Sequence, residues 1–175
     1  MTQLTEFQQW EKNIARVQLP KWKELPTLGL YVDQVAAVIN EQLANLGIEP
    51  LTKSMINNYV KKKVIQAPVK KKYAVNQIVD LLLIGLLKHN FSIEKIRAGI
   101  VQVTANSYPQ AAYDRFVEIM NAALSGQSLS DNDEIDPQKD RLMRLAVETV
   151  VASLKAQHLL AALDQDNPTV TLENK

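Results

Sequence analysis

The sequence predicts an all-α protein in which a helix-turn-helix region is joined to further helices on both sides. Apolar residues recur at spacings of three and four along most of the 175 residues, as they do on one face of a helix. The alternating pattern of a strand is limited to a short stretch around residues 64–73. Proline and glycine mark most boundaries between the helical segments, and the length suits one domain with helical extensions.

The chain is predicted to begin with a helix over residues 4–17, where apolar side chains follow the helical spacing. Pro20 and Pro26 then bracket an irregular connector, because proline lacks the backbone N–H that a helix interior needs. The sequence thus predicts an N-terminal helix that is followed by a proline-rich connector.

Two helices and a loop are predicted next. An amphipathic helix covers residues 31–46, and Gly47 follows it at the place of a left-handed C-terminal cap. Thr52 is suited to cap a second helix that runs to about residue 63. Pro68 prevents that helix from continuing, so residues 64–72 are expected to form a loop or a short hairpin.

The second half of the chain is predicted to be helical as well. Residues 75–88 are apolar on most sides, which is typical of a central buried helix. Ser92 caps the next helix, and Pro109 begins another that reaches residue 124. After an acidic linker at residues 126–136, a long helix at 137–163 carries broad apolar cover. It is either wrapped by the rest of the chain or paired with a second subunit.

These elements suggest four parts. They are an N-terminal helix with its connector (residues 1–30), a helix-turn-helix DNA-binding region (31–104), a C-terminal helical region for dimerisation or effector binding (105–165), and a tail (166–175).

Composition excludes several kinds of site. The chain has no cysteine, which rules out a disulfide framework, a cysteine-based zinc site and a cysteine nucleophile. With two histidines and five widely spaced glycines, neither a histidine-rich metal site nor a glycine-rich phosphate loop is expected. Residues 1–17 lack the pattern of a signal peptide, and no apolar run is long enough to cross a membrane. We therefore expect a cytoplasmic protein that is not an enzyme, binds no membrane and needs no cofactor or metal.

Charge is unevenly distributed, although the formal net charge is only +1. Residues 50–79 contain seven lysines and no acidic residue, whereas the rest of the chain has 13 basic and 19 acidic residues. Such a patch is typical of a protein that binds a polyanion, and a solvated lysine-rich surface is the plainer interpretation. The missing acidic residues favour the polyanion, because solvated helix faces usually mix both signs of charge.

The predicted helix at residues 52–63 separates apolar from polar side chains. On a helical wheel, one side carries Met55, Ile56, Tyr59 and Val60, and the other carries Ser54, Asn57, Asn58 and Lys61, flanked by Lys53 and Lys62. Lys63 falls on the apolar side, at the end of the helix. Hydroxyl, carboxamide and ammonium groups are those that bind base edges and phosphates. The order of helix, turn, polar helix and basic loop is that of a helix-turn-helix DNA reader.

Three stretches resemble the winged helix-turn-helix module of the MerR superfamily: LTKSMINNYVKKKVI (51–65), APVKKKY (67–73) and NQIVDLLLIGLLKHNFSIEKI (76–96). The match is closer still to an uncharacterised bacterial family that carries this module with flanking helices. The resemblance implies base contacts by Ser54, Asn57, Asn58 and Lys61, phosphate contacts by Tyr59, Lys71 and Tyr73, and sequence-independent attraction by Lys53, Lys62, Lys63, Lys70 and Lys72. Core packing is the alternative role for Tyr59 and Tyr73, and the two roles are compatible.

These observations lead to the hypothesis of a bacterial transcriptional regulator that binds specific sequences of double-stranded DNA. Its recognition helix would be residues 52–63 and its basic wing residues 68–73. A homodimer is expected, because two modules double the contact on a palindromic site, and residues 137–163, with 108–124, are the candidate dimer or effector region. The alternative is a helical protein–protein interaction module that binds no nucleic acid. The sequence identifies neither the operator nor an effector.

Overall fold

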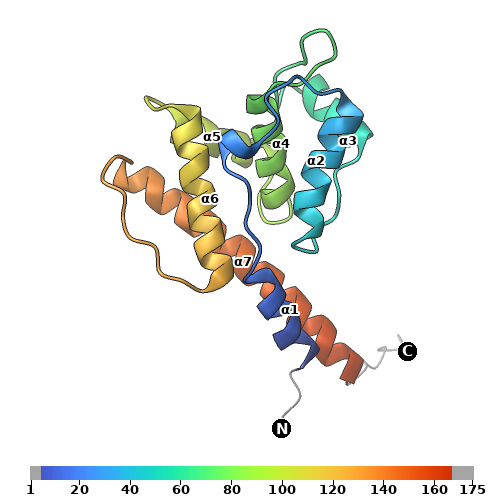
Figure 1. Cartoon of the computed structure of the whole chain (residues 1–175), viewed down its shortest axis with the longest axis vertical. Coiled ribbons are helices and arrows are strands. Elements are labelled where there is room, and N and C mark those ends of the chain that lie inside the picture. Colours follow the sequence, from blue (N-terminus) through green and yellow to red (C-terminus); the bar gives the residue numbers. More distant parts are fainter. Residues whose placement is uncertain (1–4, 167–175) are drawn as a thin grey trace, which may run out of the picture.

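The computed structural model describes residues 5–166, which form seven α-helices and one short 3-10 helix (Figure 1). In chain order these are α1 (Glu6–Ile14), η1 (Trp22–Glu24), α2 (Val32–Ala44), α3 (Lys53–Lys61), α4 (Val75–Leu87), α5 (Ile93–Thr104), α6 (Pro109–Ser125) and α7 (Pro137–Asp166). Strand-like pairing in this part of the chain is limited to two isolated β-bridges. The prediction of an all-α fold is confirmed.

Helix boundaries differ from the predicted ones at three places. The first helix ends at Ile14 rather than at residue 17, and its predicted start at residue 4 lies outside the described residues. It ends early because Leu19 is buried and its N–H is bound by the Asn121 side chain at 2.9 Å, which turns the chain onto α6. The third helix stops at Lys61, and α7 continues to Asp166. Of the predicted tail, residues 167–175 lie outside the described part.

The predicted helix caps form as expected. The Thr52 hydroxyl accepts a hydrogen bond from the Met55 N–H at 3.1 Å, and the Ser92 hydroxyl accepts one from the Lys95 N–H at 3.2 Å. Gly47 ends the turn after α2 with a φ of +68°, a conformation that glycine adopts without strain. These caps fix where α3 and α5 begin.

Helix α4 is the centre of the fold and packs against α2, α5 and α7 (Figure 1). Ten of its residues are buried, so its apolar cover on most sides has a direct structural cause. Gly85 allows α2 to approach closely, because a Cβ atom at this position would lie 2.9 Å from Leu43 Cδ1. Helix α4 therefore joins α2, on the N-terminal side of the chain, to α5 and α7 on the C-terminal side.

The connector before α2 runs along α6. The Tyr113 hydroxyl donates to the Pro20 carbonyl at 2.7 Å, and the Trp22 N–H donates to Asp114 at 2.8 Å. These two contacts join residues that are 93 and 92 positions apart in the sequence.

A buried ion cluster holds α6, α7 and the acidic linker together. Asp140 accepts from Arg115 Nε at 2.6 Å and from Arg144 Nε at 2.9 Å, and Arg115 Nη2 donates to the Ser130 carbonyl at 2.9 Å. Hydrogen bonding from Arg115 is the largest influence that holds the pKa of Asp140 below its usual range. Arg115 and Asp140 are 4% and 6% exposed, so the cluster lies inside the packed interface.

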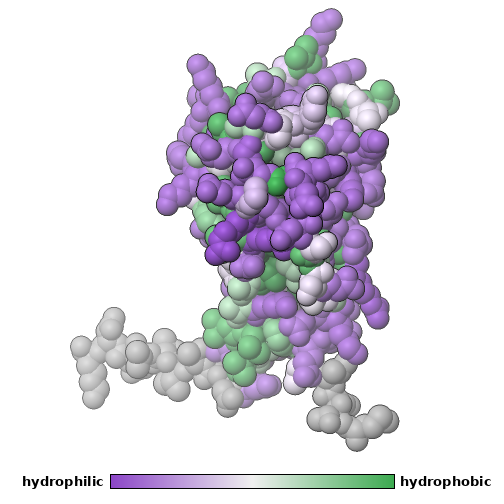
Figure 2. Space-filling view, turned by 90° about the vertical axis from the view of Figure 1, so that its left-hand side faces the viewer, coloured by the Kyte–Doolittle hydropathy of each residue, from purple (hydrophilic) through white to green (hydrophobic). Residues whose placement is uncertain are grey.

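One face of α7 is wrapped by the rest of the chain, and the opposite face is bare. Met143, Val147 and Val150 are buried on the covered face. The bare face exposes five leucines, which are Leu142, Leu145, Leu159, Leu160 and Leu163. Figure 2 shows apolar surface gathered at the end of the molecule where the last turns of α7 lie. Within residues 5–166, no helix is both long enough and apolar enough to span a membrane.

We predict that Asp140→Asn destabilises the fold by about 3 kcal/mol, because it leaves the buried Arg115 charge without its main partner. Asp131→Asn is the matched control, since Asp131 also pairs with Arg144 but is 95% exposed and should cost under about 0.5 kcal/mol. Urea denaturation measures both. Because the pKa of Asp140 is lowered on folding, its contribution is present at neutral pH and is lost as the pH falls through the folded-state pKa. Equal losses in the two variants would contradict the cluster's role.

Candidate nucleic-acid interface

Helix α3 presents a polar face to solvent, as the sequence predicted. Ile56 is fully buried and Tyr59 is 7% exposed, and these side chains attach the helix to the body. The outward residues are all exposed: Lys53, Ser54, Asn57, Asn58 and Lys61. The arrangement therefore offers a hydroxyl, two carboxamides and two ammonium groups on one short rod.

The turn between α2 and α3 is fixed by a side chain that the sequence analysis did not single out. Asn40 on α2 accepts from the Leu51 N–H at 2.7 Å and donates to the Leu51 carbonyl at 2.8 Å. The amide thus satisfies both polar groups of one peptide residue at the start of α3. Because Leu51 is itself buried, this pair of hydrogen bonds sets the position of α3 relative to α2.

All seven lysines of the acid-free segment are exposed, and they are Lys53, Lys61, Lys62, Lys63, Lys70, Lys71 and Lys72. Lys53 forms an ion pair with Asp33 of α2 at 2.6 Å, so the fold brings in an acid from outside the segment. The other six form no ion pair with any residue that the structure describes. Their charge is therefore available to a partner, while that of Lys53 is shared with Asp33.

Tyr59 and Tyr73 lie in the hydrophobic core, at 7% and 3% exposure. Burial raises the pKa of both phenols, so both stay protonated at neutral pH. Their rings take the packing role that the sequence left open as an alternative, and contact with phosphate stays a prediction.

The basic loop, residues 62–74, is anchored at its base by Gln77 of α4. The Gln77 amide donates to the Gln66 and Ala67 carbonyls, each at 2.9 Å, and its oxygen accepts from the Ala74 N–H at 2.6 Å. One buried side chain, 5% exposed, therefore binds both sides of the loop where it leaves the body. Because α4 also carries Asn76 and Asp80, its sequence did not distinguish Gln77 for this role.

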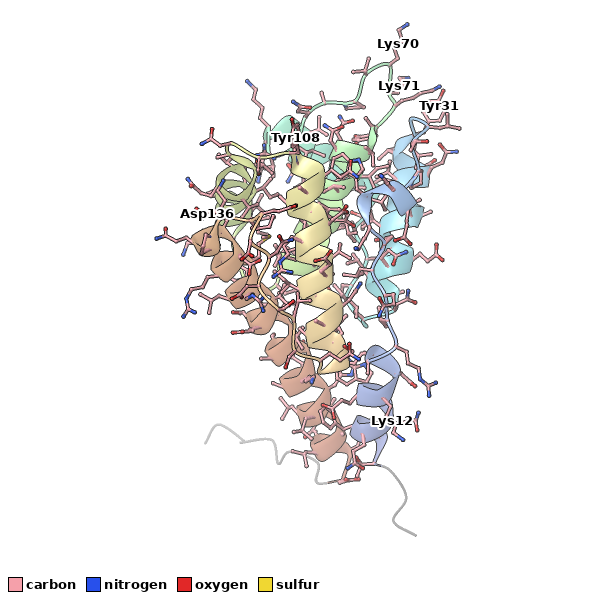
Figure 3. The ribbon with its side chains drawn as sticks, turned by 60° about the vertical axis from the view of Figure 1, so that its left-hand side comes forward. Lys12, Tyr31, Lys70, Lys71, Tyr108 and Asp136 are labelled. Atoms are coloured by element: carbon pink, nitrogen blue, oxygen red, sulfur yellow. The ribbon has the colours of Figure 1, made fainter. Side chains whose placement is uncertain are left out.

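The tip of the basic loop has an unusual backbone for its sequence. Val69 and Lys72 pair through hydrogen bonds of 3.1 and 3.0 Å, and between them Lys70 and Lys71 have φ values of +50° and +64°. Positive φ at both central residues is the mark of a type I′ turn, which strongly favours Asn-Gly. Two lysines there are strained and point outward, at the far tip of the loop (Figure 3).

The side of the loop that returns from its tip to α4 is hydrogen-bonded to the residues before α2. Leu30 and Tyr73 exchange hydrogen bonds of 3.0 and 2.7 Å in the second β-bridge. Gly29 is required there, because a Cβ atom would lie 2.9 Å from Lys72 Cβ. The Lys72 ammonium in turn lies 5.7 Å from the centre of the Tyr31 ring, within the range of a cation–π contact.

Comparison with known proteins finds a family model that covers the site. A model described as a domain of unknown function, DUF1836, matches residues 20–116. No curated protein matches the chain, and no solved structure matches it. The matched range includes α3, the basic loop and their supports on α2 and α4.

We predict that Lys71→Gly stabilises the fold by about 1 kcal/mol, because glycine adopts the positive φ of this position without the strain of a side chain. Lys62→Gly removes the same charge from the same loop at a φ of −82°, and it should destabilise slightly through the greater entropy of the unfolded chain. Urea denaturation of the two variants separates backbone strain from charge repulsion. Stabilisation of similar size in both would show that the turn is not strained.

Proposed function

Since the chain belongs to the DUF1836 family, whose function is unknown, we propose a function from the site itself: sequence-specific binding of double-stranded DNA. The protein would act as a bacterial transcriptional regulator with a MerR-like helix-turn-helix. The observation that carries this proposal is the set of six exposed lysines beside the polar face of α3 that have no ion partner among residues 5–166. A duplex offers a closely spaced row of phosphates that such a surface fits.

In this proposal α3 is the recognition helix. Its Asn57 and Asn58 carboxamides would contact base edges, since asparagine pairs with adenine in the major groove. Ser54 and Lys61 would add hydroxyl and ammonium contacts on the same face. The double hydrogen bond of Asn40 to Leu51 supports this role, because a helix that reads bases must be held at a fixed angle to the body.

The basic loop would act as the wing and contact phosphates. Lys70 and Lys71 at its tip are the furthest from the body, and the strain of their turn suggests that ammonium groups are kept there at a cost to stability. Lys72 is held over Tyr31, and Lys62 and Lys63 lie where α3 ends. Tyr59 and Tyr73 would brace this surface from below through their buried rings.

A homodimer completes the proposal. The bare face of α7 carries apolar or small residues at a heptad spacing, in positions 142, 145, 149, 152, 156, 159 and 163, all exposed. This face supports self-association through α7, with two DNA-binding surfaces in one assembly. The same face also favours the second candidate function, a helical protein–protein interaction module that binds no nucleic acid.

We predict a steep salt dependence of duplex binding. If the six unpaired lysines each neutralise one phosphate, affinity should fall about 10³-fold between 50 and 200 mM salt. Fluorescence anisotropy with a labelled random-sequence duplex measures the slope. Binding that is absent, or that barely changes with salt, would instead favour the protein–protein interaction module.

We predict different effects for Asn57→Ala and Lys71→Ala. The first should cost about 1–3 kcal/mol on a selected site and little on random DNA, because it removes a base contact. The second should weaken binding to all sequences alike and lower the salt slope by about one, because it removes a phosphate contact. Selection from a random duplex pool supplies the specific site. Equal, small effects on both kinds of DNA would contradict these roles.

A further inference from the structure

An apolar pocket lies between α4, α5, α6 and α7, and no residue of α3 or the basic loop lines it. Its space is about 860 Å³ including the open solvent at its mouth. Leu83 and Leu87 of α4, Ile100 of α5 and Phe116 of α6 form its apolar wall. The pocket lies where α4 and α5 meet α6 and α7, and all four helices contribute to its wall.

The two hydroxyl groups in this wall are already satisfied within the protein. The Thr104 hydroxyl donates to the Ile100 carbonyl at 2.7 Å, and the Tyr113 hydroxyl donates to the Pro20 carbonyl. A bound molecule therefore meets no hydroxyl group in this wall whose proton is free. The interior suits a hydrocarbon chain rather than a sugar or a nucleotide.

Gly99 in the middle of α5 gives a second, independent observation. A Cβ atom built on Gly99 meets no heavy atom within 4 Å, and the residue lines the pocket. Glycine in a helix interior is unfavourable relative to alanine, and neither a positive φ nor a close neighbour requires it here. Its effect is to leave part of the pocket wall bare.

The charges at the pocket indicate the head group of a ligand. Only Asp80 and Lys95 are charged among the lining residues. Asp80 is neutralised by Arg97, whose Nη1 lies 3.0 Å from its Oδ2. Lys95 is exposed and forms no ion pair with any residue in the range 5–166. One positive charge at the pocket is thus left for a ligand to balance.

We propose that this pocket binds a free single-chain amphiphile with an aliphatic body and a carboxylate head, in the manner of a fatty acid. The chain lies against Gly99 and the apolar walls, and the carboxylate pairs with Lys95. The site is independent of the proposed DNA binding, because α3 and the basic loop contribute no residue to it.

The test uses the full chain and dodecanoate below its micelle-forming concentration, with calorimetric titration. We expect saturable binding, and Gly99→Leu should weaken it roughly tenfold or more because the new side chain fills the space of the ligand. Ala98→Leu is the matched control, an exposed neighbour on α5 that does not line the pocket, and it should change affinity by less than about twofold. Equal weakening by both variants, or no binding of dodecanoate, would overturn the proposal.

Three further measurements test the separate parts of the argument. Gly99→Ala should raise the melting temperature, and a lower one would show that the glycine serves packing. Dodecyltrimethylammonium should bind more weakly than dodecanoate, and Lys95→Gln should reduce that preference; the reverse order would overturn the carboxylate head group. Phosphatidylglycerol vesicles offer similar chains and charge within a bilayer. If the protein sediments with these vesicles and Gly99→Leu abolishes that sedimentation, the site binds a membrane and the proposal of a free ligand is overturned.

Discussion

The hydrogen bonds of Gln77 are the constraint on which the candidate interface depends. Without them, the two sides of the basic loop would lose three hydrogen bonds to a buried side chain of α4, each of which contributes about 0.5–1.5 kcal/mol net. With them, α4 holds the loop at its base, and the Leu30–Tyr73 bridge holds the side that returns from the tip. These hydrogen bonds hold the backbone that carries the lysines against the body.

The tip of the basic loop and Gly99 of α5 are among the places where this fold gives up stability without a gain in packing. Lys70 and Lys71 occupy backbone conformations that favour glycine, and Gly99 stands where alanine would make a better helix. The two positions differ in what they keep. The turn keeps charged side chains exposed, and Gly99 keeps part of the pocket wall free of a side chain. Local rules are commonly broken at functional positions, and both proposals begin from such a break.

Sequence patterns predicted the helices and the outward face of α3 well, because helical periodicity and caps such as Thr52 act over a few residues. They could not predict contacts that depend on tertiary placement. The partner of Lys53 is Asp33, 20 positions earlier, and a count of charges within one segment missed it. Asn40 and Gln77 read as ordinary helix residues until the turn and the loop that they bind are in place. The early end of α1 likewise follows from the docking of Leu19 on α6.

The most direct test of the central claim is the reactivity of each lysine toward acetylation, measured by mass spectrometry with and without a saturating duplex. Our proposal predicts protection of Lys61, Lys62, Lys63, Lys70, Lys71 and Lys72 by DNA. Lys12 on α1, at the opposite end of the molecule, should react at an unchanged rate (Figure 3). Unchanged reactivity in α3 and the basic loop while DNA is bound, or protection of Lys12 in their place, would contradict the account.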